Sequence, residues 1–250
     1  MGHVPVRSKS DVSSFMMTSI PLRSLFTLDQ LLRFTLNYKK LPFEIVHVPV
    51  HELLATAKSA GAPPTSKYPD GSPRYTVPFI RDSHTGKTIS DSFLIAEYLD
   101  EAYPDTPKVI PTGTRVLQKV FDETVTPKLG PLVPLYIPIM LDYSSEVVLE
   151  TLKKRFGAFP PPLTDEQRAE NWKKAEVSFN ALEPVYGTTG GVFVTGDKPV
   201  WADFALAGVL ASVKIAFGEE SEEWKRTSKW IGERVGKVVD EAMGYERASE

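Results

Sequence analysis

The segment Ser90-Asp-Ser-Phe-Leu-Ile-Ala-Glu-Tyr-Leu-Asp100 decides the fold of this chain, together with Tyr75-Thr-Val-Pro-Phe-Ile80, which precedes it by about one hairpin. The earlier segment is rich in β-branched and aromatic residues and predicts a short strand with a proline near its start. The later segment begins with Asp and Ser, which are favoured where helices begin, and its apolar residues Ile95, Tyr98 and Leu99 predict one inward helical face. Together the two segments predict a strand pair that leads into a helix.

The same two segments predict a binding site for a small peptide. A helix N-terminus carries free backbone N–H groups and a partial positive charge, so with the Ser92 hydroxyl it can hold a carboxylate, while Asp91 can hold an amine. Pro78 is a candidate for a cis bond, which would leave the backbone of Val77 open to an extended ligand. Taken alone, Asp91 and Ser92 could equally be local helix caps.

The first part of the chain has the pattern of an α/β domain. Residues 1–14 form a poorly defined tail. After them the apolar pattern predicts the order βαβαββα, with strands at 15–18, 43–48, 76–81 and 87–89 and helices at 28–40, 51–60 and from Asp91. We therefore expect a thioredoxin-like domain over residues 1–103.

The second part of the chain is predicted to be helical throughout. Residues 104–114 form a proline-rich linker, and an all-helical domain follows over 115–250. Prolines separate its first two predicted helices. The helices are expected at 116–129, 139–156, 165–182, 200–217 and 222–243. The fourth is almost wholly apolar, which predicts a central buried helix.

Composition excludes some classes of partner. The 250 residues include 29 basic and 32 acidic side chains, and the net charge of −3 gives no electrostatic reason to bind nucleic acid or an anionic membrane. No apolar run is long enough to span a bilayer. We therefore expect neither nucleic acid nor membrane as a partner, and a cytoplasmic location.

The chain contains no cysteine, so the redox and nucleophilic chemistry of a cysteine side chain is excluded. Any thiol chemistry must come from the ligand. His47 and His51 have the spacing of a helical metal pair, but Pro49 lies between them. We expect no metal.

Val77-Pro78 followed by Asp91-Ser92 resembles the glutathione site of the glutathione transferases. Four further segments resemble the fungal-specific class A of that family, which is related to bacterial lignin β-etherases: LNYKKLPFE (36–44), APPTSK (62–67), PDGSP (69–73) and YPDTP (103–107). The resemblance extends from about residue 30 to the end of the chain. It implies the same two domains as the apolar pattern, and glutathione as cosubstrate.

The resemblance assigns a role to each residue of the predicted peptide site. Ser92 would bind the γ-glutamyl carboxylate and Asp91 the γ-glutamyl amine, while Val77, preceding Pro78, would pair with the cysteinyl backbone. Lys67 is either a partner for the glycine carboxylate or a solvated loop lysine.

The resemblance also implies a hydroxyl that stabilises the thiolate of glutathione, because a free thiol has a pKa of about 8.5. The serine that the fungal class carries a few residues before the position of Arg33 is missing here. Ser24 and Thr27 are the alternative candidates, with Ser19 nearby, and Thr27 could instead cap the first helix.

The helical domain is expected to contribute the hydrophobic substrate site. Leu129, Leu132 and Tyr136 either line that pocket or belong to the core. The expected function is transfer of glutathione to hydrophobic aromatic electrophiles, including β-aryl ethers and xenobiotic or wood-derived compounds, in a detoxifying enzyme. The alternative is a ligandin that binds glutathione and sequesters aromatic compounds with little catalysis. The resemblance further implies a homodimer.

Overall fold

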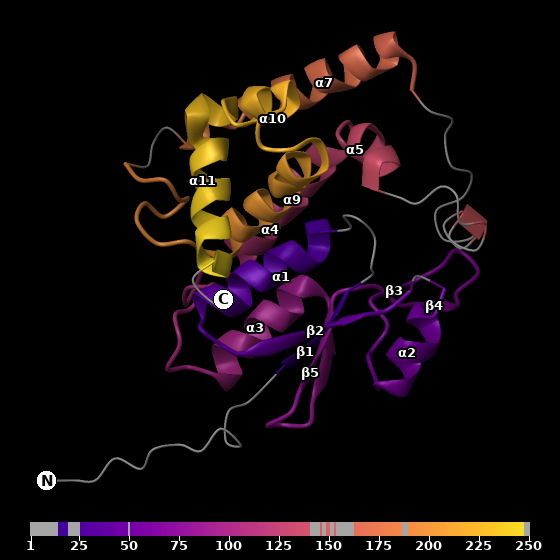
Figure 1. Cartoon of the computed structure of the whole chain (residues 1–250). Coiled ribbons are helices and arrows are strands. Elements are labelled where there is room, and N and C mark those ends of the chain that lie inside the picture. Colours follow the sequence, from indigo (N-terminus) through magenta and orange to yellow (C-terminus); the bar gives the residue numbers. More distant parts are fainter. Residues whose placement is uncertain are drawn as a thin grey trace, which may run out of the picture.

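The computed structural model describes residues 15–19, 26–49, 51–140, 146, 149–150, 153, 163–186 and 190–247. A small mixed sheet carries the helices α1 and α3 on one face, and a helical domain is stacked on those two helices (Figure 1). This arrangement confirms the predicted fold, a thioredoxin-like domain followed by an all-helical one.

The first domain has the predicted order of strands and helices. Its elements are β1 (Phe15–Ser19), α1 (Phe26–Tyr38), β2 (Phe43–His47), α2 (Leu53–Ser59), β5 (Phe79–Asp82), β6 (Thr88–Ser90) and α3 (Ser92–Ala102). The loop expected before β5 also contains a small hairpin of β3 (Ser66–Lys67) and β4 (Pro73–Arg74). Strands of two residues are too short to give an alternating apolar pattern, so the sequence did not predict them.

The register of the sheet places the ends of three strands side by side. The strand order is β2-β1-β5-β6, with β1 parallel to β2 and the other pairs antiparallel. Thr18 lies opposite Phe79, and Phe79 lies opposite Ser90. Consequently the end of β1, the start of β5 and the end of β6 lie at one end of the sheet.

Helix α1 packs on the sheet of its own domain with one face and on the helical domain with another. Leu32 and Leu36 join a buried cluster with Ile80 of the sheet, whereas Leu31 and Phe34 belong to the core of the helical domain. Because the two pairs lie on different faces of one helix, α1 is buried on two sides. Figure 1 shows α1 and α3 between the sheet and the helices above it.

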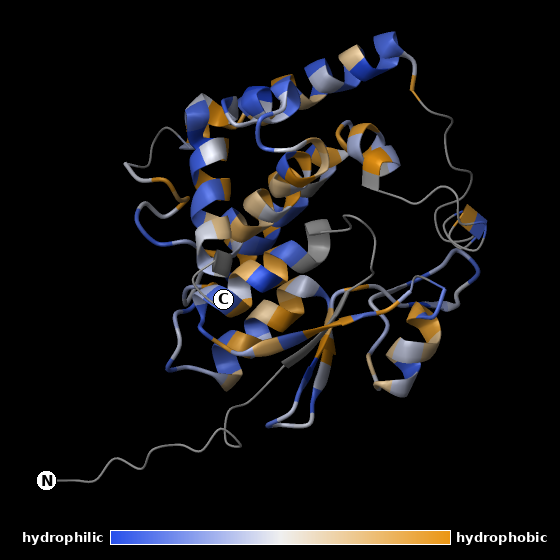
Figure 2. Cartoon of the chain, viewed as in Figure 1, coloured by the Kyte–Doolittle hydropathy of each residue, from blue (hydrophilic) through white to orange (hydrophobic). Residues whose placement is uncertain are grey.

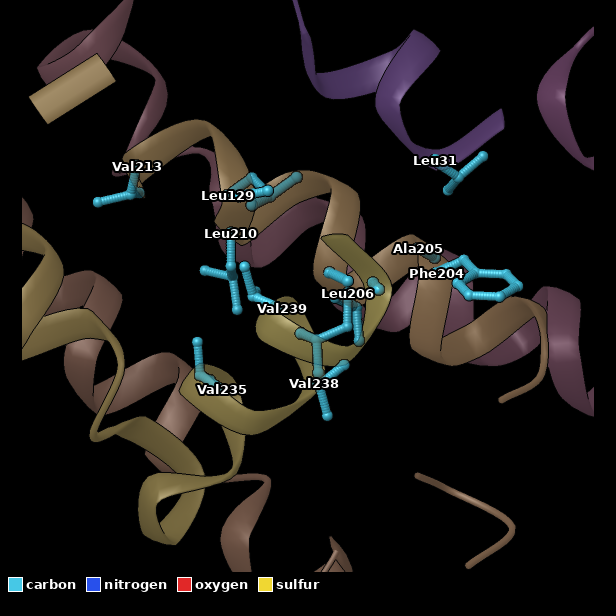
Figure 3. Packing of buried hydrophobic residues seen from close by; sticks show 14 of the residues in the cluster. Leu31, Leu129, Phe204, Ala205, Leu206, Leu210, Val213, Val235, Val238 and Val239 are labelled. Carbon is cyan, nitrogen blue, oxygen red and sulfur yellow. The ribbon is translucent and has the colours of Figure 1, made fainter. Parts of the chain in front are cut away.

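Helix α9 is the buried centre of the second domain, as predicted. The elements of this domain are α4 (Arg115–Val125), a 3-10 turn (Thr126–Leu129), α5 (Val133–Met140), α7 (Asp165–Asn180), α8 (Glu183–Tyr186), α9 (Trp201–Phe217), α10 (Glu222–Thr227) and α11 (Trp230–Arg247). Leu206 and Leu210 of α9 lie beside Val235 and Val238 of α11 (Figure 3). The outer helix α7 is largely hydrophilic by comparison (Figure 2).

The expected break between the first two helices of this domain is wrong. Helix α5 forms across Pro134 and Pro138. Pro134 is tolerated because it lies in the first turn, where backbone N–H groups have no partner within the helix. Most of the helix predicted at 139–156 lies outside the described residues.

The single helix expected at 222–243 is also wrong. The chain forms α10 and α11 instead, and Ile231, Gly232 and Glu233 have left-handed backbone angles with φ of 55°, 61° and 63°. The Asn180 side chain accepts a hydrogen bond from the Ile231 N–H at 2.9 Å. Trp230 and Ile231 are buried at this bend.

Asp203 holds the N-terminus of α9. Its carboxylate accepts hydrogen bonds from the N–H groups of Val200 at 2.9 Å and Val194 at 2.8 Å. Burial raises the pKa of Asp203 to about 7, although these hydrogen bonds act in the opposite direction. Val200 has no acceptor in its side chain, so Asp203 supplies the capping interaction from within the helix.

The segment between α3 and α4 is held by a buried ion pair. Lys39 Nζ lies 2.6 Å from Asp100 Oδ1 and also donates to the carbonyl of Pro107 at 2.9 Å. The Asp100 carboxylate accepts from the N–H groups of Val109 and Ile110 at 3.1 and 2.8 Å. One buried carboxylate therefore joins α1, α3 and the connecting segment.

Helices α1 and α9 cross at Gly208. A Cβ atom at this position would lie 2.9 Å from Cβ of Leu31 and 3.1 Å from its backbone nitrogen. No larger side chain fits at this distance without a shift of one helix.

We expect Gly208→Ala to lower the free energy of unfolding by about 1–3 kcal/mol, because the added methyl group meets the backbone of α1. The matched control is Gly244→Ala in α11, where a Cβ would meet nothing within 4 Å. That variant is expected to be neutral or slightly stabilising. Urea unfolding of both proteins is the measurement, and equal effects would contradict the close crossing.

Candidate functional site

The Val77–Pro78 peptide bond is cis, as the sequence suggested, and lies directly before β5. Pro78 is buried, and the partly buried Val77 side chain packs on a cluster that includes Leu53 and Phe79. Among the described residues, the backbone of Val77 has no hydrogen-bond partner. The side chain therefore faces the protein, and the backbone is left available to an extended ligand.

Asp91 and Ser92 lie beside this bond because of the strand register. Phe79 pairs with Ser90, so Pro78 and Asp91 are the next residues beyond that pair on the neighbouring strands. The two dipeptides that the sequence singled out thus meet at one end of the sheet, where α3 begins.

Asp91 caps α3 with one of its carboxylate oxygens. Its Oδ1 accepts from the N–H groups of Phe93 at 3.0 Å and Leu94 at 3.1 Å, and its backbone has a φ of 76°. No described residue bonds to Oδ2 of Asp91 or to the Ser92 hydroxyl. The local capping role is therefore real, and it leaves polar atoms of both residues for a ligand.

Lys67 lies on β3, opposite Pro73, and its side chain is exposed. The hairpin is tied to the strand region by Thr65, whose hydroxyl lies 3.0 Å from that of Thr76. This contact sets β3 near Val77. No described acidic side chain forms an ion pair with Lys67. Its position is compatible both with a partner for the glycine carboxylate and with a solvated loop lysine.

The candidate catalytic hydroxyls are placed only in part. Ser24 lies outside the described residues. The backbone of Thr27 lies in the first turn of α1, but its side chain is outside the described part. Ser19 ends β1 at the same end of the sheet as Pro78. The choice between Ser24 and Thr27 therefore stays a prediction.

Leu129, Leu132 and Tyr136 lie in the core of the helical domain. Their exposed fractions are 9%, 0% and 4%, and burial raises the pKa of Tyr136 to about 12. These positions match the core alternative rather than an open pocket lining. Among the α5 side chains that the structure describes, the apolar Val133 and Ile139 are exposed, at 39% and 45%.

Phe93 is not among the residues that the sequence predicts for the site, yet it follows Ser92 directly and is only 3% exposed. Its ring contacts residues of α4 and α9, which are distant in sequence. The available signal was a second apolar face of α3, formed by Phe93 and Ala96, beside the face of Ile95 and Leu99.

The two domains match two known family descriptions. Residues 30–102 match the N-terminal domain of glutathione S-transferase, and residues 115–245 match its C-terminal domain. The chain belongs to the glutathione S-transferase family. The resemblance found in the sequence is thereby confirmed at the level of the family and the enzyme class.

Solved and curated relatives of this transferase include fungal proteins. A glutathione S-transferase of Ceriporiopsis subvermispora in complex with glutathione is 32% identical, with a TM-score of 0.83 over 93% of this chain and 97% of its own. The glutathione transferase GSTFuA3 of Phanerochaete chrysosporium is 28% identical, with a TM-score of 0.83 over 94% and 98%. The glutathione S-transferase-like protein ustS of Aspergillus flavus is 27% identical over 72% of this chain and 71% of its own.

Within the described residues, no helix combines the length and apolar character needed to cross a bilayer. The same residues contain no group of three or more His, Cys, Asp or Glu side chains that could hold a metal ion. His51 lies near Glu52, with 3.6 Å between Nε2 and Oε1.

We expect Asp91→Ala to lower the free energy of unfolding by about 1–2 kcal/mol, because α3 loses its cap and alanine tolerates a positive φ poorly. Asp91→Asn should cost less, because asparagine caps helices and adopts such angles more readily. Urea unfolding is the measurement, with the exposed Asp105→Ala as control. Equal losses for Ala and Asn would count against the capping role.

Proposed function

We propose that this transferase binds glutathione at Val77, Pro78, Asp91 and Ser92 and transfers its thiolate to hydrophobic aromatic electrophiles. The observation that carries the proposal is the strand register, which sets the open backbone of Val77 beside the N-terminus of α3. The glutathione complex of the Ceriporiopsis relative supports the choice of ligand.

Each part of glutathione has a matching group in this proposal. The γ-glutamyl carboxylate accepts from the Ser92 hydroxyl and from the N-terminus of α3, whose eleven residues give a partial positive charge. The γ-glutamyl amine donates to Oδ2 of Asp91, since Oδ1 is used by the helix. The cysteinyl backbone pairs with Val77, and Lys67 faces the glycine carboxylate.

The proposed reaction is a nucleophilic substitution or addition by the sulfur of glutathione. The S–H proton passes to solvent, and a hydroxyl from Ser24 or Thr27 donates a hydrogen bond that stabilises the thiolate. The thiolate forms a C–S bond with the electrophilic carbon. In a substitution the leaving group departs with the bonding electron pair, and in an addition the resulting carbanion takes up a proton from solvent. No cysteine of the chain competes with the ligand sulfur.

The second substrate is proposed to be apolar. Leu129, Leu132 and Tyr136 are too deeply buried to touch a substrate in this conformation, so they would support the site from behind. Val133 and Ile139 present apolar surface on α5 and are candidates for direct contact. Aromatic compounds of the xenobiotic, wood-derived or β-aryl ether type fit such a surface, in a detoxifying role in the cytoplasm.

We also propose membership of the fungal-specific class A and a homodimer. The sequence segments given above and the fungal relatives support the class. Leu94 of α3 and three residues of α4, Val116, Leu117 and Val120, expose between 49% and 69% of their apolar side chains. We propose that a second copy of this chain packs on this surface in the dimer. A sedimenting mass of twice that of the chain supports the dimer, and the mass of a single chain contradicts it.

A glutathione-binding ligandin is the second candidate, because the serine expected before α1 is missing. Calorimetry with glutathione tests the binding site that both candidates share. Turnover of a chlorinated nitrobenzene and of a β-aryl ether model at saturating glutathione separates them. Rates above buffer support the transferase, whereas tight aromatic binding without turnover supports the ligandin. Absence of glutathione binding would end both.

We expect Ser92→Ala to weaken glutathione affinity by about tenfold or more, because the serine hydroxyl meets a charged carboxylate. Thr27→Ala should weaken affinity less, because Thr27 is a candidate for the sulfur alone. Calorimetric titration of both variants is the measurement. Equal or reversed losses would contradict the assignment of Ser92.

A further inference from the structure

Phe93 is buried at the junction of the two domains, immediately after Ser92. Its side chain is 3% exposed, and its N–H donates to Oδ1 of Asp91 at 3.0 Å. The residue therefore belongs to the first turn of α3, which supplies the proposed carboxylate and amine site. Any displacement of Phe93 displaces that turn.

The Phe93 ring is held by three side chains of the helical domain. Trp201 of α9 packs edge-to-face on it, with 5.5 Å between ring centroids and an interplanar angle of 83°. The Arg115 guanidinium and the Lys119 ammonium of α4 lie 5.6 and 5.4 Å from the ring centroid. Aromatic and cation–π contacts of this kind fix the orientation of a ring.

The groups that hold the ring are themselves anchored. The backbone N–H of Trp201 donates to the carbonyl of Val109 at 2.7 Å, and the backbone N–H of Ala202 donates to Oε1 of Gln118 on α4 at 2.9 Å. Arg115 also pairs with Glu97, one turn further along α3. The first turn of α3 is thus attached to α4, to α9 and to the segment between the domains.

We infer that Phe93 is a positioning residue for glutathione, clamped by Arg115, Lys119 and Trp201 so that the helical domain sets the affinity of the first domain's amino-acid site. This inference rests on the proposed function. Phe93 does not face the ligand itself. It fixes the N–H groups and the Ser92 hydroxyl in the geometry that binds the γ-glutamyl end.

The first test compares Phe93→Leu with Phe179→Leu. Phe179 is also fully buried and stacks on Trp230 at 5.5 Å, but it lies on α7, away from α3. Both variants should lose thermal stability. Only Phe93→Leu should raise the Kd for glutathione, by about five- to tenfold, from the lost aromatic and cation–π contacts. Its kcat at saturating glutathione should stay unchanged, because the proposed thiol-activating hydroxyls lie elsewhere.

A second test leaves the core intact. Arg115→Met with Lys119→Met removes two partly exposed charges and keeps apolar stems, with an expected rise in Kd of about threefold. If these cations act through the ring, the same pair of substitutions should have no further effect in the Phe93→Leu background. An effect of equal size in both backgrounds would show that the cations act independently of the ring, through the Glu97 pair or on the ligand itself, and would overturn the inference.

The outcomes separate the inference from the proposed function. A wild-type protein without affinity for glutathione overturns both. Binding by the wild type with an unchanged Kd in Phe93→Leu overturns the inference alone and leaves Phe93 as interdomain packing. Faster amide exchange over 92–95 in Phe93→Leu, with no such change in Phe179→Leu, is the structural result that supports the clamp.

Discussion

The buried ion pair between Lys39 and Asp100, both in the first domain, holds the segment that leads to the helical domain, and the placement of that domain depends on it. Lys39 has no exposed surface, and Asp100 is only 8% exposed. A buried charge without a partner is strongly destabilising, so neither residue can be removed singly at low cost. Asp100 also binds the Val109 N–H, and the Val109 carbonyl accepts from Trp201. One carboxylate thereby sets where the segment between the domains lies and where α9 begins.

Helices α1 and α3 serve as core elements for both domains at once. Each directs one apolar face to the sheet and another to the helical cluster. Gly208 allows α9 to approach α1 at backbone distance, so α1 packs closely on the centre of the helical domain. The site at the start of α3 is consequently built on an element that neither domain positions alone. This explains why a helical domain can influence groups that belong to the first domain.

Much of the fold could be predicted from the sequence, because the strands and helices of the first domain have clear apolar periods. The placement of Val77 beside Asp91 followed from a recognisable hairpin. Helix α5 was missed because Pro134 is harmless in a first turn, and the break before α11 because Asn180 and left-handed backbone geometry decide it. Phe93 was missed since its partners are distant in sequence. The thiol-activating hydroxyl could not be chosen, because neither spacing nor the described residues place one beside the sulfur.

In the proposed glutathione site, the Asp91 carboxylate divides its two oxygens between two tasks. One oxygen completes α3, and the other is free of described protein partners. Folding and recognition therefore cannot be optimised independently at this position. A library screened only for affinity would also be selected for the integrity of α3, whereas one screened only for thermal resistance would accept asparagine, which caps the helix without the charge. Substitution of Asp91 is therefore constrained twice: Oδ1 is needed to cap α3, and Oδ2 is needed for the proposed contact with the ligand amine.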